Sequence, residues 1–130
     1  MIQDTSFIID LLKNDDGAVA KLEEIETNRV PQKCSSITVL ELFEGIYQFD
    51  EITEERQTVL DILKSKHIVD ADQDLMETAG KISGKLLREG NQIDREDCVI
   101  AATAIQENEP VLTRNANHFQ RIDALTVETY

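Results

Sequence analysis

The chain has 130 residues, and its 41% hydrophobic and 30% charged residues are the proportions of an ordinary globular domain rather than of a disordered chain. Its 26 acidic and 13 basic residues give a net charge of −13, which argues against broad, non-specific nucleic-acid binding, because such binding depends on a basic surface. The longest uncharged run, residues 98–106, is much shorter than the roughly 18 apolar residues of a membrane span, so we expect no contact with a membrane.

We expect one domain over residues 1–130, located in the cytoplasm. The N-terminus lacks the basic and apolar segments of a signal peptide. Cys34 and Cys98 lie among apolar neighbours and form no metal-spaced pair, which predicts two reduced, buried residues.

Hydrophobic periodicity predicts alternating strands and helices along the chain. The predicted strands lie near residues 1–4, 34–37, 67–69, 110–113 and 125–128, and the predicted helices cover 8–12, 18–27, 38–49, 53–66, 70–89 and 94–105. The buried side chains expected for the third and fifth helices are Val39, Leu42, Phe43, Ile46 and Tyr47, and Leu75, Met76, Ala79, Ile82 and Leu86. This alternation indicates the α/β class, with a mostly parallel sheet of about five strands covered on both faces.

Acidic side chains occur near the starts of three predicted helices. Asp4 follows the first strand, Glu41 lies beside the apolar stripe of helix 38–49, and Asp94 and Asp97 open helix 94–105. Sites in parallel sheets form beyond the carboxyl ends of the strands, so we expect these acids to converge. The alternative is structural: Asp4 or Asp94 can cap its helix, Asp97 is at the capping-box position, and Glu41 can be an ordinary surface residue.

Converging carboxylates predict a divalent cation. Two of them about 4 Å apart repel by roughly 4 kcal/mol at an effective dielectric constant near 20, and a metal ion removes this conflict. Mg²⁺ and Mn²⁺ prefer oxygen ligands and bind phosphate oxygens, so an acidic cluster without His or Cys indicates phosphodiester chemistry. A row of Lys81, Lys85 and Arg88 on helix 70–89 is a candidate for contact with phosphate, although most such rows are solvated faces.

Four segments, in order along the whole chain, resemble the VapC branch of the PIN-domain ribonucleases: DTSFIIDLL, SSITVLELFEGI, DREDCVIAATAI and VLTRNANHF. The resemblance implies a Rossmann-like α/β/α sandwich and endonucleolytic RNA cleavage that depends on Mg²⁺ or Mn²⁺. It also implies a toxin of a toxin–antitoxin pair, dimerisation, and inhibition by a cognate VapB antitoxin.

The family's motif positions fall on Asp4, Glu41 and Asp97, which the resemblance implies are catalytic metal ligands, and on Asp94, which matches an acid that can serve a second ion. The next position, often Asp in the wider superfamily, is Asn115, whose amide carries no charge.

The residues around Asn115 have several possible roles. Thr113 is expected to orient an acid or water, and Arg114 to meet a phosphate of the substrate or to cover the edge of the sheet. His118 and Phe119 are expected to serve packing rather than catalysis.

Two other functions remain open from the sequence. The uncharged Asn115 and the net charge of −13 suit a catalytically weak PIN fold that acts as a binding module in a regulatory complex. A small-molecule phosphatase is the weaker alternative, since no early DxD nucleophile motif is present.

Partner surfaces are expected near the ends of helices. An acidic, partly desolvated site attracts a basic side chain, so an antitoxin is expected to place an Arg there. Candidate apolar residues for the dimer and antitoxin surfaces are Leu11, Leu12, Phe43, Tyr47 and Phe49.

Overall fold

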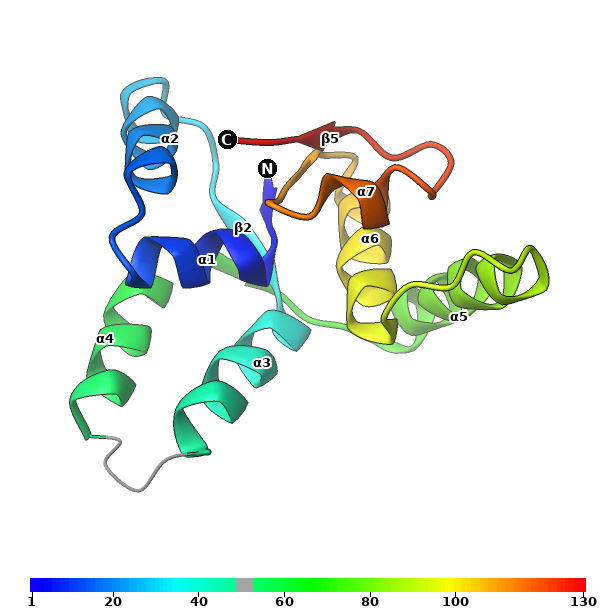
Figure 1. Cartoon of the computed structure of the whole chain (residues 1–130), viewed down its shortest axis with the longest axis horizontal. Helices are drawn as coiled ribbons and strands as arrows, with labels where there is room; N and C mark the ends of the chain where they lie inside the picture. The colour runs from blue at the N-terminus through cyan, green and yellow to red at the C-terminus, as the bar shows by residue number, and fades with distance from the viewer. Residues whose placement is uncertain (49–52) are drawn as a thin grey trace.

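A five-stranded parallel sheet forms the centre of the computed structural model, which describes residues 1–48 and 53–130 (Figure 1). The strands are β1 (Ile2–Gln3), β2 (Lys33–Ser35), β3 (His67–Val69), β4 (Val111–Leu112) and β5 (Val127–Glu128). Their order is β3-β2-β1-β4-β5, and every neighbouring pair is parallel. The predicted α/β class is therefore confirmed, with the sheet entirely rather than mostly parallel.

Helices cover both faces of the sheet. They are α1 (Thr5–Leu12), α2 (Asp16–Thr27), α3 (Ser36–Tyr47), α4 (Thr53–Leu63), α5 (Gln73–Arg88), α6 (Arg95–Glu107) and α7 (Ala116–Phe119). In Figure 1, α1, α2 and α4 lie on one side of the strands, and α5 and α6 lie on the other. None of the helices in the described ranges combines the length and the apolar composition needed to cross a bilayer.

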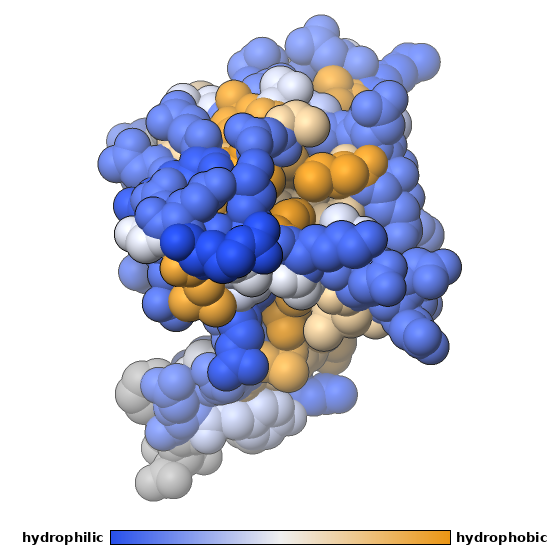
Figure 2. Space-filling model, turned by 90° about the vertical axis from the view of Figure 1, so that its right-hand side faces the viewer, coloured by the Kyte–Doolittle hydropathy of each residue, from blue (hydrophilic) through white to orange (hydrophobic). Residues whose placement is uncertain are grey.

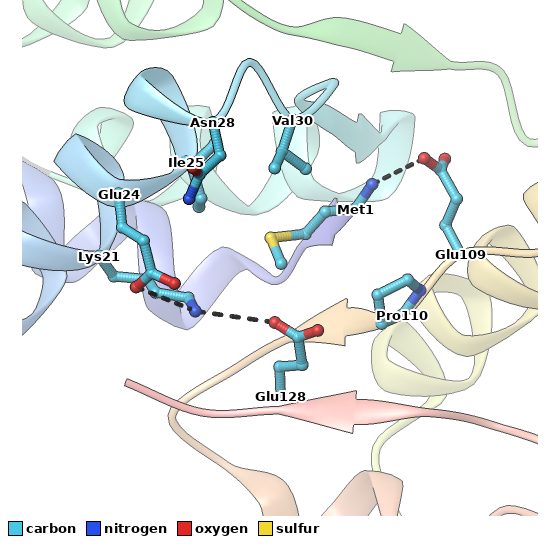
Figure 3. A pocket seen from close by; sticks show the side chains of 9 residues that line it. All are labelled: Met1, Lys21, Glu24, Ile25, Asn28, Val30, Glu109, Pro110 and Glu128. Carbon is cyan, nitrogen blue, oxygen red and sulfur yellow. Dashed lines mark hydrogen bonds and ion pairs between the residues drawn. The ribbon is translucent and has the colours of Figure 1, made fainter.

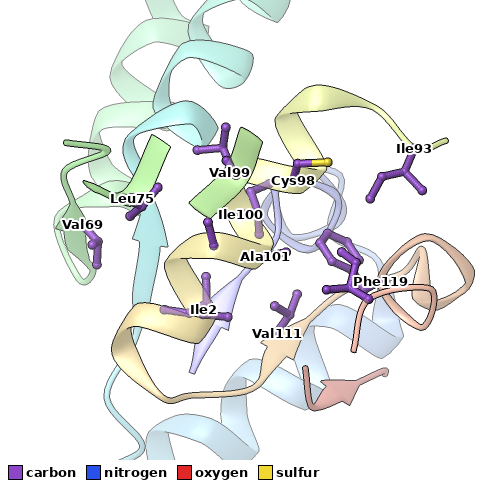
Figure 4. Close-up of a cluster of buried hydrophobic side chains, with 14 of the residues drawn as sticks. Ile2, Val69, Leu75, Ile93, Cys98, Val99, Ile100, Ala101, Val111 and Phe119 are labelled. Carbon is purple, nitrogen blue, oxygen red and sulfur yellow. The ribbon is translucent and has the colours of Figure 1, made fainter. Parts of the chain in front are cut away.

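The core between the sheet and α5 and α6 is built largely from α6. Ile100 and Ala101 are fully buried against Ile2 and Val111, and Phe119 of α7 closes one end of the cluster (Figure 4). Small residues along α6 allow this helix to lie close to the strands. Burial of Phe119 is as predicted, and the cluster fixes the N-terminal end of α6 beside the sheet.

A second core lies on the opposite face, where Phe7, Ile8 and Ile25 pack with residues of α3 and α4. Cys34 belongs to this second core, whereas Cys98 belongs to the first. Both cysteines are buried and free, as predicted. Since the sheet separates the two thiols, the fold cannot join them in a disulfide.

Side-chain caps set the boundaries between strands and helices. Ser35 ends β2 and caps α3, because its hydroxyl accepts a hydrogen bond from the backbone N–H of Ile37 at 3.2 Å. The predicted strand over 34–37 therefore stops two residues early. Asp72 caps α5 in the same way through the N–H of Leu75, at 2.9 Å. The short helix α7 was not predicted.

Two side chains predicted to be buried are exposed. Tyr47 is 55% exposed at the end of α3, and Met76 is 47% exposed on α5. Helix α5 buries only a narrow stripe that includes Leu75 and Ala79, and Met76 lies about 100° round the helix from Leu75. On the side of the molecule that carries α5, Figure 2 shows apolar side chains set among hydrophilic ones. Phe49, also predicted as a surface residue for partners, lies outside the described residues.

Candidate active site

Asp4 is the first acidic residue at the carboxyl edge of the sheet, directly after β1. Its side chain is 2% exposed and caps α1, with Oδ1 accepting the N–H of Thr5 at 2.8 Å. Oδ2 accepts hydrogen bonds from the hydroxyls of Ser6 and Thr113, each at 2.7 Å. A buried carboxylate is tolerated when hydrogen bonds to its charged form compensate for lost water, and here three donors do so. Asp4 is therefore both a helix cap and a fixed, ionisable group.

Glu41 reaches the same place from the second turn of α3. Its Oε1 accepts a hydrogen bond from the hydroxyl of Thr5 at 2.7 Å, and this hydroxyl also lies 3.0 Å from that of Thr38. Thr5 thus contacts Asp4 through its backbone and Glu41 through its side chain. Burial raises the pKa of Glu41 to about 7; the bond from Thr5 opposes this rise, and the nearby carboxylates of Asp4 and Asp97 add to it.

Asp97 extends from the first turn of α6. Its Oδ2 lies 2.9 Å from Nδ1 of His118, which comes from α7 and is 39% exposed. Burial raises the pKa of Asp97, the His118 bond opposes the rise, and the charges of Asp4 and Asp94 add to it. His118 is therefore not a core residue: its ring contacts a carboxylate of the site, and its expected packing role is not tested by this contact.

The capping alternative for α6 is not supported by its side chains. Asp94 has the N-cap backbone conformation, but its carboxylate makes no capping hydrogen bond and is exposed. Asp97, at the capping-box position, bonds to His118 instead. The carboxylates of Asp94 and Asp97 thus lie near the positive end of the helix dipole and near other acidic side chains without capping the helix.

The arrangement fits a divalent cation in its chemistry but is not a preformed ion site. The charges of Asp4 and Asp97 raise the pKa of Glu41, the charge of Asp4 raises the pKa of Asp97, and the donor atoms of the three side chains are the oxygens that Mg²⁺ and Mn²⁺ prefer. In residues 1–48 and 53–130, however, no three Asp, Glu, His or Cys side chains stand at ligating spacing. The side chains of Asp4, Glu41 and Asp97 would each have to shift to ligate one ion together.

The residues after β4 are tied to Asp4 through their backbone. Thr113 is fully buried, which favours orientation of Asp4 over contact with a substrate. Asn115 donates its backbone N–H to the Thr113 hydroxyl at 2.8 Å, but its exposed side chain has no recorded hydrogen bond within the described chain. The guanidinium of Arg114 pairs with Asp10 of α1. It does not pair with Asp4, Glu41 or Asp97, which together form the acidic centre of the site.

Within the described residues, no hydrogen bond or ion pair joins the basic row of α5 (Lys81, Lys85 and Arg88) to the acidic residues of the site. Lys85 pairs with Asp123 at 2.6 Å, and Lys81 lies 3.6 Å from Glu77 of its own helix. Arg88 is exposed near the end of α5. A role of this row in binding RNA therefore stays a prediction.

A pocket of about 330 Å³ lies at the opposite, amino-terminal edge of the sheet (Figure 3). Met1, Ile25, Val30 and Pro110 give it apolar walls. Its charged residues are already paired, as in the contact of 3.7 Å between Lys21 and Glu128. Asp4 and Thr113 follow the far ends of β1 and β4, so this pocket is separate from the acidic centre.

The raised pKa values predict how the metal-free protein responds to pH. Folding favours the protonated form of Glu41, so its contribution to stability is full below its ordinary pKa of 4.5 and is lost as pH rises through about 7. Asp97 acts in the same direction. With a chelator present, we expect the melting temperature to fall by a few degrees between about pH 5 and about pH 8, followed by circular dichroism.

Glu41→Gln is the matched control for this measurement, since it keeps the acceptor for Thr5 but cannot ionise. We expect a flatter pH profile for this variant and higher stability than the parent near pH 8. Identical profiles for the two proteins would contradict the assigned environment of Glu41. The range stops near pH 8 because burial lowers the pKa of Lys66 to about 8, and stability gained from its deprotonation appears above that pH.

Comparisons with known proteins agree with this fold and cover nearly the whole chain. The family model for the PIN domain matches residues 1–125. Ribonuclease VapC1 of Methanocaldococcus jannaschii is 32% identical over 100% of this chain and 86% of its own length, and the tRNA(fMet)-specific endonuclease VapC of Shigella flexneri is 27% identical over 98% and 95%. The solved structure of VapBC2 from Rickettsia felis, bound to a DNA fragment from its promoter, superposes with a TM-score of 0.89 at 25% identity, over 99% of this chain and 97% of the other.

Proposed function

The chain belongs to the PIN-domain family, and from this premise we propose that it is a metal-dependent endoribonuclease, the toxin of a VapBC toxin–antitoxin module. It acts as a single PIN domain and hydrolyses phosphodiester bonds of RNA. Relatives that align over almost their entire length are named as VapC ribonucleases, which supports the activity. A cytoplasmic site of action follows from the proposed RNA substrate.

The observation that carries the proposal is the meeting of Asp4, Glu41 and Asp97 at the carboxyl edge of the sheet. Each comes from the start of a different helix, and Thr5 contacts two of them. Burial and neighbouring carboxylates raise the pKa values of Glu41 and Asp97, so the charged forms of these residues are a cost to the metal-free fold, and such sites are typical of function rather than of structure. Their proposed role is to ligate metal and support catalysis.

The proposed cofactor is Mg²⁺ or Mn²⁺, held by Asp4, Glu41 and Asp97, with Asp94 and Asn115 as candidates for a second ion. VapC nucleases of the PIN family are generally metal-dependent, and the all-oxygen donor set suits these two ions. When bound, such an ion makes an attacking hydroxide available near neutral pH and stabilises charge on the leaving oxygen.

The surrounding residues position the carboxylates for this role. Ser6 and Thr113 donate to the same oxygen of Asp4, so Oδ1, which accepts only the N–H of Thr5, has the greater capacity left to ligate an ion. Thr5 fixes Glu41, and His118 fixes Asp97. We propose that these partners restrict the rotation of each carboxylate, so that less order has to be gained when the metal and RNA bind.

The proposed partner is a VapB-type antitoxin, as in the VapBC complexes that share this fold. A groove of about 450 Å³ between α1, α3 and α4 supports it: Ile9, Leu12, Ile46 and Val59 line the apolar part, and the charged residues are Glu54, Glu55 and Lys13, so negative charge exceeds positive. Apolar walls with acidic residues suit an amphipathic basic segment. We propose that such a segment ends with an Arg at the acidic centre, and that the toxin forms a homodimer or a hetero-oligomer with the antitoxin.

A second function, that of a catalytically weak binding module, has one observation in its favour. The described residues hold no preformed set of three ligands, and Asn115 brings no charge. A module of this kind would bind its partner through the same grooves without cutting RNA.

A circular single-stranded RNA separates the functions. With purified protein and millimolar Mn²⁺, we expect the circle to be opened, followed on a denaturing gel, because an endonuclease needs no free end. A circle that stays intact while a linear RNA of the same sequence is shortened would contradict endonucleolytic cleavage. If neither RNA is cut, the binding module is favoured.

A further inference from the structure

Asp10 is a buried carboxylate that lies outside the acidic centre. It occupies α1 six residues after Asp4 and is 6% exposed. Its Oδ1 accepts a hydrogen bond from Nη1 of Arg114, and its Oδ2 accepts one from the hydroxyl of Tyr130 at 2.5 Å. Burial of a charge is costly unless the charge is both paired and hydrogen-bonded, and Asp10 meets both conditions. The two contacts join α1 to the residues that follow β4 and β5.

Tyr130 limits how Arg114 can meet this carboxylate. Its ring packs edge-on against Phe7, with 5.0 Å between ring centroids and 72° between planes. Burial, and then the bond to Asp10, raise the pKa of the phenol, so the hydroxyl stays protonated and donates. Since the hydroxyl occupies Oδ2, Arg114 contacts a single oxygen instead of forming the two-pronged pair that Arg and carboxylate commonly make.

Arg114 therefore keeps N–H groups available to another ligand. A guanidinium has five N–H donors, and the side chain of Arg114 is 50% exposed. Its backbone N–H donates to Oγ of Ser6 at 3.1 Å, and that hydroxyl donates to Asp4. Six residues of helix rise by about 9 Å, so the backbone position that holds Arg114 through Asp10 is about 9 Å along α1 from that of Asp4.

We propose that Arg114, held in place by Asp10 and Tyr130, binds a backbone phosphate of the RNA strand beside the bond that the acidic centre cleaves. Asp10 and Tyr130 are then positioning residues for this contact. The inference rests on the proposed ribonuclease function and adds a subsite to it.

The net negative charge of the chain explains why RNA binding needs a contact between Arg114 and a phosphate. A chain with a net charge of −13 repels RNA at long range, so binding has to come from cations at fixed positions. Lys85 and Lys81 are engaged with acidic residues of this chain. The planar guanidinium matches the geometry of phosphate oxygens, and Arg114 is linked through Ser6 to the proposed metal ligand Asp4.

Binding of a short, fluorescein-labelled single-stranded RNA of mixed sequence tests the proposal. Fluorescence anisotropy is measured over a range of KCl concentrations in the Asp97→Asn background with chelator, so that the RNA stays intact. Adding Arg114→Gln is expected to raise Kd about tenfold. It is also expected to reduce the slope of log Kd against log salt by about 0.7, the loss of one phosphate contact on a single strand. Arg56→Gln, which removes an exposed charge from α4, is the matched control and should change neither quantity.

Tyr130→Phe tests the positioning role, because it keeps the ring and removes only the hydroxyl. The freed Oδ2 of Asp10 can then take a second N–H of Arg114 and draw the guanidinium from the RNA. We expect Kd to rise about threefold in the binding assay. In otherwise wild-type protein with Mn²⁺, we expect KM to rise by a similar factor while kcat changes little.

The outcomes separate this subsite from the proposed function. If Arg114→Gln leaves Kd and the salt slope unchanged, or if Arg56→Gln lowers affinity equally, the subsite is rejected while the ribonuclease assignment stands. If Arg114→Gln lowers the melting temperature but leaves RNA binding unaltered, the contact between Arg114 and Asp10 is purely structural, and the subsite is also rejected. If the parent protein binds no RNA and opens no circular RNA, both proposals fail. If Arg114→Gln does not fold, the double variant Asp10→Asn, Arg114→Gln is used in its place. The double variant leaves no unpaired buried charge, because Asp10 is neutralised together with Arg114.

Discussion

Replacing Asp97 by asparagine is expected to reduce Mn²⁺-stimulated RNA cleavage by roughly 100-fold to 1,000-fold while the protein stays folded. A ligand carboxylate contributes to metal binding and to stabilising the charge of the transition state, which together amount to several kcal/mol, and each 1.4 kcal/mol is a factor of ten. Asparagine has nearly the same shape and keeps an oxygen for the contact with His118. The measurement is the initial rate of cleavage of the circular RNA, with circular dichroism as the test of folding.

The metal-free stability of Asp97→Asn supplies an independent test. Because burial and the neighbouring acids raise the pKa of Asp97, removal of its charge is expected to leave the melting temperature at pH 7 to 8 unchanged or higher. Glu96→Gln, one residue away and exposed, is the matched control and should retain most of the activity. Full cleavage by a highly purified Asp97→Asn protein would rule out the assigned role.

Removal of the metal is expected to abolish cleavage, and its return to restore it. EDTA should bring the rate to background, and millimolar Mg²⁺ or Mn²⁺ added in excess should recover it, because without an ion nothing lowers the pKa of the attacking water or stabilises charge on the leaving oxygen. A ligand that binds only the folded state also stabilises it, by about 2.7 kcal/mol at 100 times its Kd. We therefore expect Mn²⁺ to raise the melting temperature most near pH 8, where Glu41 is mostly unprotonated and repulsion is greatest.

Calorimetric titration with Mn²⁺ distinguishes the enzyme from the binding module. Wild-type protein should show saturable binding in the millimolar range or tighter, and Asp97→Asn should bind more weakly. The Glu96→Gln protein serves again as the control for general loss of negative charge. Absence of both a binding isotherm and a shift in melting temperature at millimolar Mn²⁺ would favour the binding module.

The acidic centre was predictable because its position depends on topology more than on side-chain detail. In a parallel sheet, residues that directly follow strands gather at one edge, so Asp4 after β1 and Glu41 soon after β2 had to approach one another. Asp97 was predictable because carboxylates open a helix that is otherwise almost entirely buried. The period of the apolar residues located all five strands and all the longer helices.

The supporting contacts were not predictable because they join residues with no periodic relation. His118 lies 21 positions after Asp97 and on the four-residue helix α7, which has too few residues to show a helical pattern. Asp10 and Tyr130 are 120 positions apart. The available signal for the cluster of Asp10, Arg114 and Tyr130 was an Asp in the middle of a short helix, at a place where an apolar residue is expected. The exposure of Tyr47 and Met76 was not predicted. Periodicity indicates which face of a helix is buried, but it does not indicate how much of that face the neighbouring elements cover.

The parallel sheet also determines when, during synthesis, the activity can arise. β1 lies between β2 and β4, so Asp4 acquires its hydrogen bond from Thr113 only after β4 has emerged from the ribosome. A nascent chain that has emerged through α6 contains all three carboxylates but lacks the strand that orders one of them and the histidine that orders another. A domain of this topology folds as a unit. We therefore expect a nascent chain that has emerged only through α6 to be inactive, because the residues that order Asp4 and Asp97 have not yet emerged.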